Sequence, residues 1–251
     1  MKIIALTNQK GGVGKTTSTI NLGAGLAKLG KKVLLIDLDP QANLTYSLKM
    51  HSNRMEKTVY HGLKGEASLK EILIKHNGFD FIPSSLELSG AEMELANEPA
   101  REGLLKNLLT QLKPDEYDFV LIDCPPNLGL LTLNAFTAVT EIFIVLQSEY
   151  LALHGLSKLL DLIRIVQQRL NKQLEVGGII CTMYDNRKNL NKEVVGHIKD
   201  YFGKKVFKTI IRDNVALAEA PSHHKTIFEY DGGSAGAQDY FALAKEIKNG
   251  H

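Results

Sequence analysis

The stretch Asn8-Gln9-Lys10-Gly11-Gly12-Val13-Gly14-Lys15-Thr16-Thr17 follows a short apolar run at residues 3–6 and precedes apolar residues at helical spacing over residues 20–27. This order predicts a buried strand, a glycine-rich loop and a helix. Glycines let backbone N–H groups turn toward an anion, and the N-terminus of the following helix adds partial positive charge. We therefore predict that residues 11–17 bind a polyphosphate.

The side chains at the end of this loop have the chemistry of a magnesium–nucleotide site. Lys15 is placed to reach the terminal phosphates, and the hydroxyl of Thr16 is a suitable magnesium ligand. The strict pattern G-x-x-x-x-G-K-[ST] is not met, because Gln9 replaces its first glycine and Lys10 follows. A glycine-rich turn without a ligand would explain three glycines, but not their order with a lysine and two threonines. The predicted nucleotide-binding residues are Gly11, Gly12, Val13, Gly14, Lys15, Thr16 and Thr17.

Carboxylates follow two further apolar runs. Asp37-Leu38-Asp39-Pro40-Gln41 comes directly after residues 33–36, and Asp123 comes directly after residues 119–122. Ligands of parallel sheets bind at the carboxyl ends of the strands, so a site is favoured over a solvated turn. An aspartate at the end of a rigid apolar strand, as at Asp123, is typical of a residue that binds magnesium, often through a water.

The alternation of apolar runs with helical patterns defines the fold class. Strands are predicted at residues 3–6, 33–36, 79–82, 119–122, 141–146 and 177–183, and helices at 68–75, 84–95, 102–112, 151–170 and 235–248. This order predicts an α/β fold, with a doubly wound, mostly parallel sheet and helices on both faces. No Pro/Gly/Ser-rich linker divides the 251 residues, so we expect one domain, residues 1–251. Residues 44–78 receive no functional assignment.

Composition narrows the class of protein. The chain is 44% hydrophobic, and no apolar run approaches the roughly 18 residues that a membrane helix needs. There is no hydrophobic region of a signal peptide, and Cys124 and Cys181 lack metal-ligand spacing. We expect a cytoplasmic protein with reduced thiols and no membrane attachment.

Positive charge is concentrated late in the chain. The formal net charge is only +2, but residues 185–212 contain eight basic and three acidic residues. The basic residues are Arg187, Lys188, Lys192, Lys199, Lys204, Lys205, Lys208 and Arg212. A solvated helix face and a polyanion-binding surface are both compatible with this composition. If DNA binds here, its phosphates are the expected contacts, and binding should be largely independent of sequence.

The loop sequence K-G-G-V-G-K-T-T resembles the deviant Walker A box of the ParA/MinD superfamily of P-loop NTPases. The resemblance implies ATP and Mg²⁺ as ligands and a homodimer when ATP is bound. It implies that Lys15 binds its own nucleotide, whereas Lys10 reaches the partner's phosphates and stabilises the transition state as an arginine finger does. Hydrolysis of ATP would then require dimerisation, with Lys10, Lys15 and Asp39 as catalytic residues.

Two further motifs resemble the ParA branch of this superfamily. The D-x-D-P-Q form implies that Asp39 positions or activates the attacking water, while Asp37 supports the magnesium and the loop geometry. The sequence Asp123-Cys124-Pro125-Pro126 matches the D-x-P-P switch of the family. Cys124 is predicted to be a structural thiol, which disfavours an iron–sulfur carrier.

The DNA-contacting segments of the family match less completely. Residues 182–187 resemble the segment that carries a DNA-contacting arginine, which implies Arg187. Residues 211–217 read I-R-D-N-V-A-L where the family commonly reads I-P-R-N-V-R-L. Asn214 keeps the adenine-facing asparagine, whereas Arg212 replaces the proline and Ala216 replaces a second DNA-contacting arginine. DNA affinity is therefore expected to be weaker, or to depend on Lys204, Lys205 and Lys208.

The resemblance implies an ATP-dependent switch that binds nonspecific DNA on the nucleoid as a dimer. A ParB-like activator would release it by stimulating hydrolysis, in chromosome or plasmid segregation. The same switch could instead position a carboxysome, a chemoreceptor cluster or cellulose synthase. A small-molecule ATP-dependent ligase of the same fold is a further alternative, which would need an acceptor pocket and no Lys10.

Overall fold

The computed structural model describes residues 1–48, 57–149, 152 and 156–250 of the chain. Its centre is a seven-stranded sheet in the order β3-β4-β2-β5-β1-β6-β7. The strands are β1 (Lys2–Thr7), β2 (Val33–Asp37), β3 (Ile74–His76), β4 (Phe79–Ile82), β5 (Phe119–Asp123), β6 (Glu141–Gln147) and β7 (Glu175–Thr182). All neighbouring pairs are parallel except the antiparallel pair β3–β4. The predicted fold class is confirmed.

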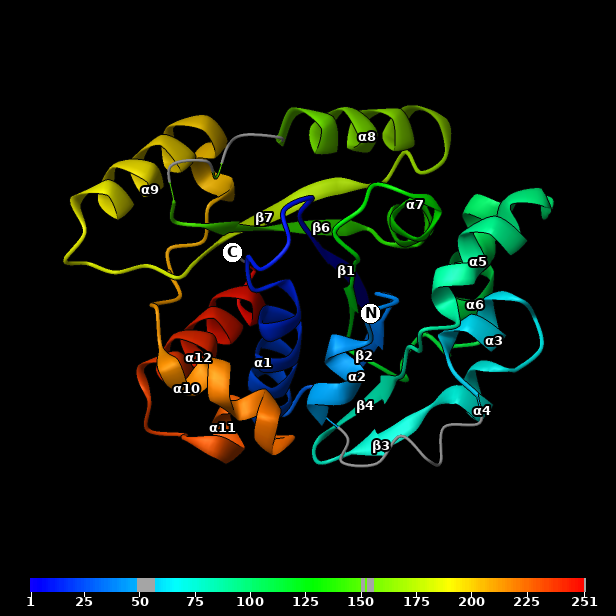
Figure 1. Cartoon of the computed structure of the whole chain (residues 1–251), viewed down its shortest axis with the longest axis horizontal. Helices are drawn as coiled ribbons and strands as arrows, with labels where there is room; N and C mark the ends of the chain where they lie inside the picture. The colour runs from blue at the N-terminus through cyan, green and yellow to red at the C-terminus, as the bar shows by residue number, and fades with distance from the viewer. Residues whose placement is uncertain (49–56, 150–151, 153–155, 251) are drawn as a thin grey trace.

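Helices cover both faces of the sheet (Figure 1). On one face lie α7 (Leu130–Ala138), α8 (Leu156–Arg169) and α9 (Asn189–Phe202), and on the other lie α1 (Lys15–Lys28), α2 (Asn43–Leu48), α10 (Val215–Glu219), α11 (Ile227–Tyr230) and α12 (Ala235–Lys248). The short helices α3 (Val59–Leu63), α4 (Leu69–Ile72), α5 (Leu88–Glu94) and α6 (Leu104–Leu109) gather at the β3–β4 end. No helix of the described residues is long and apolar enough to cross a membrane.

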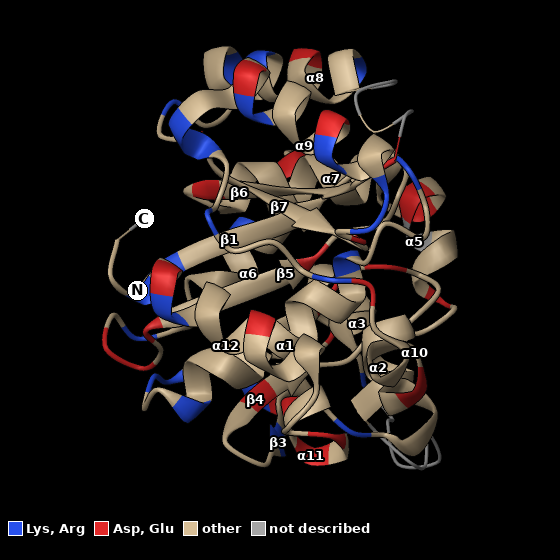
Figure 2. Ribbon diagram, turned by 90° about the vertical axis from the view of Figure 1, so that its left-hand side faces the viewer, with Lys and Arg blue, Asp and Glu red and all other residues tan. Residues whose placement is uncertain are grey.

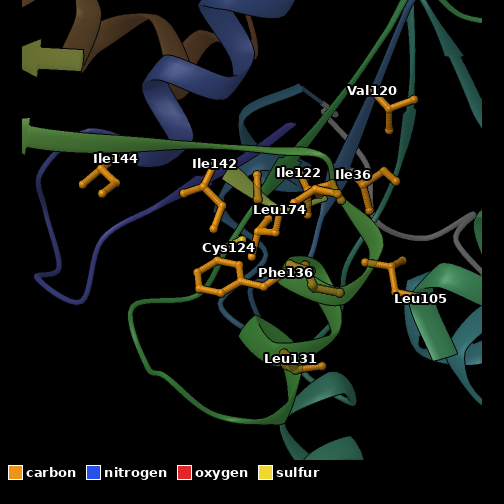
Figure 3. Close-up of a cluster of buried hydrophobic side chains, with 14 of the residues drawn as sticks. Ile36, Leu105, Val120, Ile122, Cys124, Leu131, Phe136, Ile142, Ile144 and Leu174 are labelled. Atoms are coloured by element: carbon orange, nitrogen blue, oxygen red, sulfur yellow. The ribbon is translucent and has the colours of Figure 1, made fainter. Parts of the chain in front are cut away.

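The core consists of two apolar clusters, one on each face of the sheet. Successive residues of a strand join opposite clusters: Ala5 and Ile36 belong to the first, and Ile4 belongs to the second. Figure 3 shows the first cluster, with Leu131 and Phe136 of α7 below the strand residues. Burial on both faces explains why these strands are continuous apolar runs in the sequence, and it holds their carboxyl ends rigidly at one edge.

The predicted helix at residues 68–75 is wrong in its second half. α4 ends at Ile72, and Lys75 lies in β3, opposite Asp80 of β4. The turn between these strands contains Gly78 at φ +84°, a conformation that favours glycine, and it brings the chain back antiparallel. Helical spacing over so few residues did not distinguish a helix from this hairpin.

Two other helices are shorter than predicted. α5 covers only Leu88–Glu94 of the segment 84–95, and α6 covers only Leu104–Leu109 of the segment 102–112. For the helix predicted at residues 151–170, α8 covers Leu156–Arg169, while residues 151 and 153–155 lie outside the described part of the chain. The terminal helix α12 has the predicted bounds, Ala235–Lys248.

Candidate nucleotide site

The glycine loop connects β1 to α1 in a conformation that its glycines permit. Gly12 and Gly14 have φ values of +74° and +89°, in the left-handed region. Two neighbouring strands hold the loop: Asn8 Nδ2 donates to Val145 O of β6 at 2.7 Å, and Thr182 Oγ1 of β7 donates to Val13 O at 2.8 Å. The backbone is therefore fixed on both sides before any ligand binds.

Lys15 is the first residue of α1 and is only 7% exposed. Its Nζ donates to the carbonyl of Lys10 at 3.3 Å. Burial lowers the pKa of Lys15, and the carboxylates of Asp123 and Asp39 oppose that shift. A buried ammonium surrounded by carboxylates and N–H groups is suited to binding phosphate oxygens at this position.

Thr16 and Asp123 are the residues that could hold a metal. Thr16 Oγ1 donates to Asp123 Oδ2 at 2.6 Å, whereas Asp123 Oδ1 is buried with no hydrogen-bond partner among the described residues. The described residues contain no group of three or more His, Cys, Asp or Glu that could hold a metal ion by themselves. Magnesium is typically held by one or two protein oxygens together with substrate phosphates. The orphaned carboxylate oxygen beside a hydroxyl therefore fits magnesium that arrives with a nucleotide.

Asp37 accepts hydrogen bonds from residues of its own loop and of α2. Both of its oxygens accept hydrogen bonds from protein: Oδ1 from the Asp39 amide at 3.2 Å, and Oδ2 from the amide and hydroxyl of Thr45 at 2.9 and 2.7 Å. Asp39 itself is 7% exposed and accepts a hydrogen bond from the Gln41 amide. The geometry supports the predicted loop-shaping role of Asp37 and leaves less of its carboxylate for magnesium.

Next to the loop lies a cavity of about 120 Å³. Its lining includes Gly14, Thr17, Met183, Asn214, Leu217 and Tyr240. Asn214 Oδ1 is buried there with no hydrogen-bond partner among the described residues, so it can accept from the amino group of a purine. The predicted role of Asn214 agrees with this position. Met183 and Leu217 were not predicted as pocket residues, because their apolar character does not separate them from core residues in the sequence.

A larger cleft, of about 610 Å³, lies far from these groups between α3 and α6. Its lining includes Lys64, Glu94, Leu95 and Gln111. Some buried side-chain N and O atoms have no hydrogen-bond partner in the described part of the chain, and none of them lines this cleft. The chemistry of the site is at the glycine loop and not in this larger cleft.

Lys10 lies at the open rim of the site. Its Nζ donates to Gln147 Oε1 at 3.1 Å and to Glu149 Oε2 at 3.3 Å, both at the end of β6, and its side chain is 44% exposed. Within one protomer, Lys10 therefore contacts β6 of its own chain. The predicted contact with a partner's phosphates would require Lys10 to leave these two residues.

The predicted DNA-contacting residues are all exposed and are spread over one region. They lie in the β7–α9 loop (Arg187, Lys188), on α9 (Lys192) and in the segment after it (Lys204, Lys205, Lys208, Arg212). Figure 2 shows basic residues interspersed with acidic ones on the α8 and α9 side of the sheet. The structure thus brings these basic residues into one region, but the surface there carries both positive and negative charges.

The two arginines differ in their freedom. The Arg187 side chain is 86% exposed and pairs with Asp185 at 2.9 Å, which lowers the pKa of Asp185 to about 2. Arg212 makes hydrogen bonds of 2.7 to 3.1 Å from its guanidinium to Asp239 of α12 and also lines the small cavity. The guanidinium of Arg212 is therefore held by hydrogen bonds inside the protein, which makes Arg212 a poorer candidate for phosphate contact than Arg187.

Known proteins resemble this chain over nearly its whole length. The family AAA_31, described as an AAA domain, matches residues 1–176. The sporulation initiation inhibitor protein Soj of Bacillus subtilis (strain 168) is 50% identical over 248 residues, which cover 98% of each chain. The chromosome-partitioning ATPase Soj of Treponema pallidum (strain Nichols) is 53% identical over 249 residues, which cover 98% of this chain and 96% of the relative.

A solved structure agrees with the fold and with the ligand chemistry. Cobyrinic acid a,c-diamide synthase from Mycobacterium smegmatis, crystallised with ADP and magnesium, aligns with a TM-score of 0.87 and 34% identity. The alignment covers 99% of this chain and 94% of that chain.

Proposed function

Because this chain belongs to the Soj/ParA family of chromosome-partitioning ATPases, we propose that it is a Mg²⁺-dependent ATPase whose bound nucleotide sets its oligomeric state. In the ATP-bound state it forms a homodimer that binds DNA nonspecifically. A ParB-like activator stimulates hydrolysis to ADP and phosphate, which returns the protein to the monomer and releases it from the nucleoid.

One observation carries the nucleotide part of this proposal. Asp123 presents a buried oxygen that has no hydrogen-bond partner within the described part of the chain, beside the Thr16 hydroxyl and close to the Lys15 ammonium, at the N-terminus of α1. A magnesium–triphosphate complex supplies the cation for this carboxylate and the anion for Lys15 at the same time. Bound magnesium would neutralise charge on the phosphates as they react.

The residues of this chain divide the remaining work. The loop amides and Lys15 bind and orient the phosphates, and the Asn214 amide accepts from the adenine amino group. Asp39, held between Asp37 and Gln41, orients the attacking water. Lys10 of the partner subunit adds the second positive charge at the transferred phosphoryl group, so that hydrolysis depends on the dimer.

The DNA part of the proposal is supported by the exposed basic residues of the β7–α9 region. Thr182, at the end of β7, donates to the carbonyl of Val13 in the glycine loop. The loop that carries Arg187 therefore begins beside the nucleotide site. This proximity gives a physical route by which nucleotide occupancy affects the DNA-binding surface. The cargo follows from the family, so chromosome segregation is favoured over plasmid, carboxysome, chemoreceptor or cellulose synthase positioning.

A second candidate function is that of an ATP-dependent ligase, because the structural relative from Mycobacterium smegmatis is a diamide synthase. An ATP-dependent ligase acting on a small acceptor would show turnover that depends on the acceptor and not on DNA. It would also have no need for Lys10 in a partner's site. Both predictions separate it from the partition switch.

The decisive experiment compares the purified protein with ATP, with ADP and without nucleotide, all in Mg²⁺. Sedimentation measures the oligomeric state, and fluorescence anisotropy with two unrelated duplexes measures DNA binding. The expected result is a dimer bound equally to both duplexes with ATP only. A protein that stays monomeric with ATP while hydrolysing it at full rate would contradict the proposal.

A further inference from the structure

Four buried residues close a ring of hydrogen bonds behind the loop that carries Asp39. Thr45 Oγ1 donates to Asp37 Oδ2 at 2.7 Å and accepts from the Ser84 amide at 2.9 Å. Ser84 Oγ donates to the Asp39 carbonyl at 2.8 Å. The Asp39 amide donates to Asp37 Oδ1 at 3.2 Å, which closes the ring. Both peptide groups of Asp39 are therefore held, and the Thr45 hydroxyl links Asp37 to Ser84, the two residues that hold them; the Thr45 amide also donates to Asp37 Oδ2, at 2.9 Å.

The ring is closed to solvent. The exposed fractions of Asp37, Thr45 and Ser84 are 0%, 1% and 1%. Water has no access to replace a lost partner, so removing the Thr45 hydroxyl would leave the buried Ser84 amide unsatisfied. The loop would relieve the loss of this hydrogen bond by moving until the Ser84 amide meets a new acceptor.

The Asp39 loop has a conformation that needs such support. Ala42, three residues later, has φ +53° and is 1% exposed. This left-handed conformation is unfavourable for a residue with a Cβ, and it persists where surrounding contacts over-determine it. The Ala42 amide also donates to the Asp39 carbonyl, at 2.8 Å. The Ser84 hydroxyl and the Ala42 amide thus meet at the same oxygen.

The ring also attaches the loop to the neighbouring strand β4. Ser84 follows β4, and the preceding carbonyl of Pro83 accepts from the Val59 amide of α3 at 2.8 Å. Asp37 ends β2, the neighbour of β4. The position of Asp39 is therefore determined by two rigid strands and not by its own loop alone.

We propose that Thr45 is a positioning residue for the hydrolysis step, which acts on Asp39 through Asp37 and Ser84. The Thr45 hydroxyl is bonded to Asp37 and Ser84, so it would act without contacting the nucleotide or the attacking water. The inference rests on the proposed function, in which Asp39 orients that water. A shift of the order of 1 Å in a catalytic group costs about 100-fold in rate, so a loosened ring should slow hydrolysis without weakening nucleotide binding.

The test replaces Thr45 with Val, which keeps the shape of the side chain and removes the hydroxyl. The single-turnover rate of ATP hydrolysis should fall about 10- to 100-fold, with the affinity for a non-hydrolysable ATP analogue changed less than about threefold. Thr45→Ser, which restores the hydroxyl, should recover the rate to within about threefold. Thr137→Val is the matched control, because it removes a buried hydroxyl of α7 that donates only to Leu133 O of its own helix.

A double variant separates positioning from a general structural effect. In an Asp39→Ala background, Thr45→Val should cause no further loss of rate, because its effect passes through Asp39. An additional loss in that background, or an equal fall in rate and analogue affinity in the single variant, would overturn the proposal.

Hydrogen exchange tests the ring without reference to activity. The amides of Asp39, Ala42 and Ser84 should exchange faster in Thr45→Val than in the wild type, and at the wild-type rate in Thr137→Val. Unchanged exchange at these three amides would overturn the proposal. If the wild-type protein hydrolyses no ATP, the proposed function fails, and the exchange result alone decides whether Thr45 holds the loop.

Discussion

Asp37 and Asp123 are register partners on the neighbouring strands β2 and β5, and both side chains are completely buried. Burial, opposed by the hydrogen bonds from Thr45, raises the pKa of Asp37 to about 7. Burial together with the charge of Asp37 raises the pKa of Asp123 well above its usual range. The nucleotide-free site therefore holds two carboxylates whose joint ionisation is unfavourable until a cation arrives.

The first prediction concerns the stability of the nucleotide-free protein. Both pKa values are raised above those of the unfolded chain, so the stability from protonated carboxyls is present below about pH 4 and is lost as the pH rises through about 7. Asp123→Asn should remove the part of this loss that is due to Asp123 and raise the Tm at pH 8 by about 3–6 °C relative to the wild type, with a smaller difference at pH 5. Thermal unfolding at both pH values measures the effect.

The same variant should lose its response to the metal. ATP should raise the Tm of the wild type more with Mg²⁺ than with EDTA, whereas Asp123→Asn should show no such difference, because it lacks the carboxylate that faces the cation. Asp200→Asn, which removes an exposed charge on α9, is the control and should behave as the wild type. A destabilised Asp123→Asn protein at pH 8 would contradict the repulsion between the two carboxylates.

The second prediction tests the buried lysine. Lys15→Ala removes the buried ammonium of the loop, which interacts electrostatically with Asp123 and Asp39, so affinity for ATP and ADP should fall by at least about 100-fold. Titration with a fluorescent nucleotide measures this change. Lys28→Ala, at the other end of the same helix, should bind nucleotide normally. Retained affinity in Lys15→Ala would assign the phosphates to a different place.

The sequence predicted the groups of the site that follow an apolar run, although these groups are far apart along the chain. The glycine loop, Asp39 and Asp123 each stand at the end of an apolar run, and parallel strands bring such ends to one edge. β3 was missed because its three residues have no alternation long enough to read. Ser84 was predicted only as the first residue of a helix, yet its hydroxyl donates to the Asp39 carbonyl. A contact across 45 residues has no local pattern, so only the folded chain reveals it.

The third prediction concerns the second lysine of the loop. In one protomer Lys10 contacts Gln147 and Glu149, and neither contact is buried. Exposed pairs of this kind contribute only about 0–1 kcal/mol, so exchange for a partner's phosphates is energetically accessible. Lys10→Ala should bind ATP within about threefold of the wild-type affinity but should not dimerise with it.

Glu149→Gln gives the converse test, because it weakens the competing contact inside the protomer. Its ATP-dependent dimer should form at an equal or lower protein concentration than that of the wild type. Lys2→Ala, which removes another exposed ion pair, with Glu141, is the control. Sedimentation at several concentrations measures all three variants, and an ATP-dependent dimer of Lys10→Ala with normal hydrolysis would remove Lys10 from the partner's site.

The fourth prediction separates the two arginines of the basic region. Arg187 is exposed and forms an ion pair with Asp185, whereas the guanidinium of Arg212 donates repeatedly to Asp239. Arg187→Ala should therefore weaken DNA binding by the ATP-bound protein about 3- to 10-fold and reduce the slope of log affinity against log salt by about 1. Arg212→Ala should lower the Tm and the nucleotide affinity, since it breaks contacts beside the small cavity, and should leave the salt slope nearly unchanged. Anisotropy titrations at several salt concentrations, with nucleotide affinity measured in parallel, separate the roles of Arg187 and Arg212.

A loss of nucleotide affinity in Arg187→Ala equal to its loss of DNA affinity would place Arg187 at the nucleotide rather than on the DNA-binding surface.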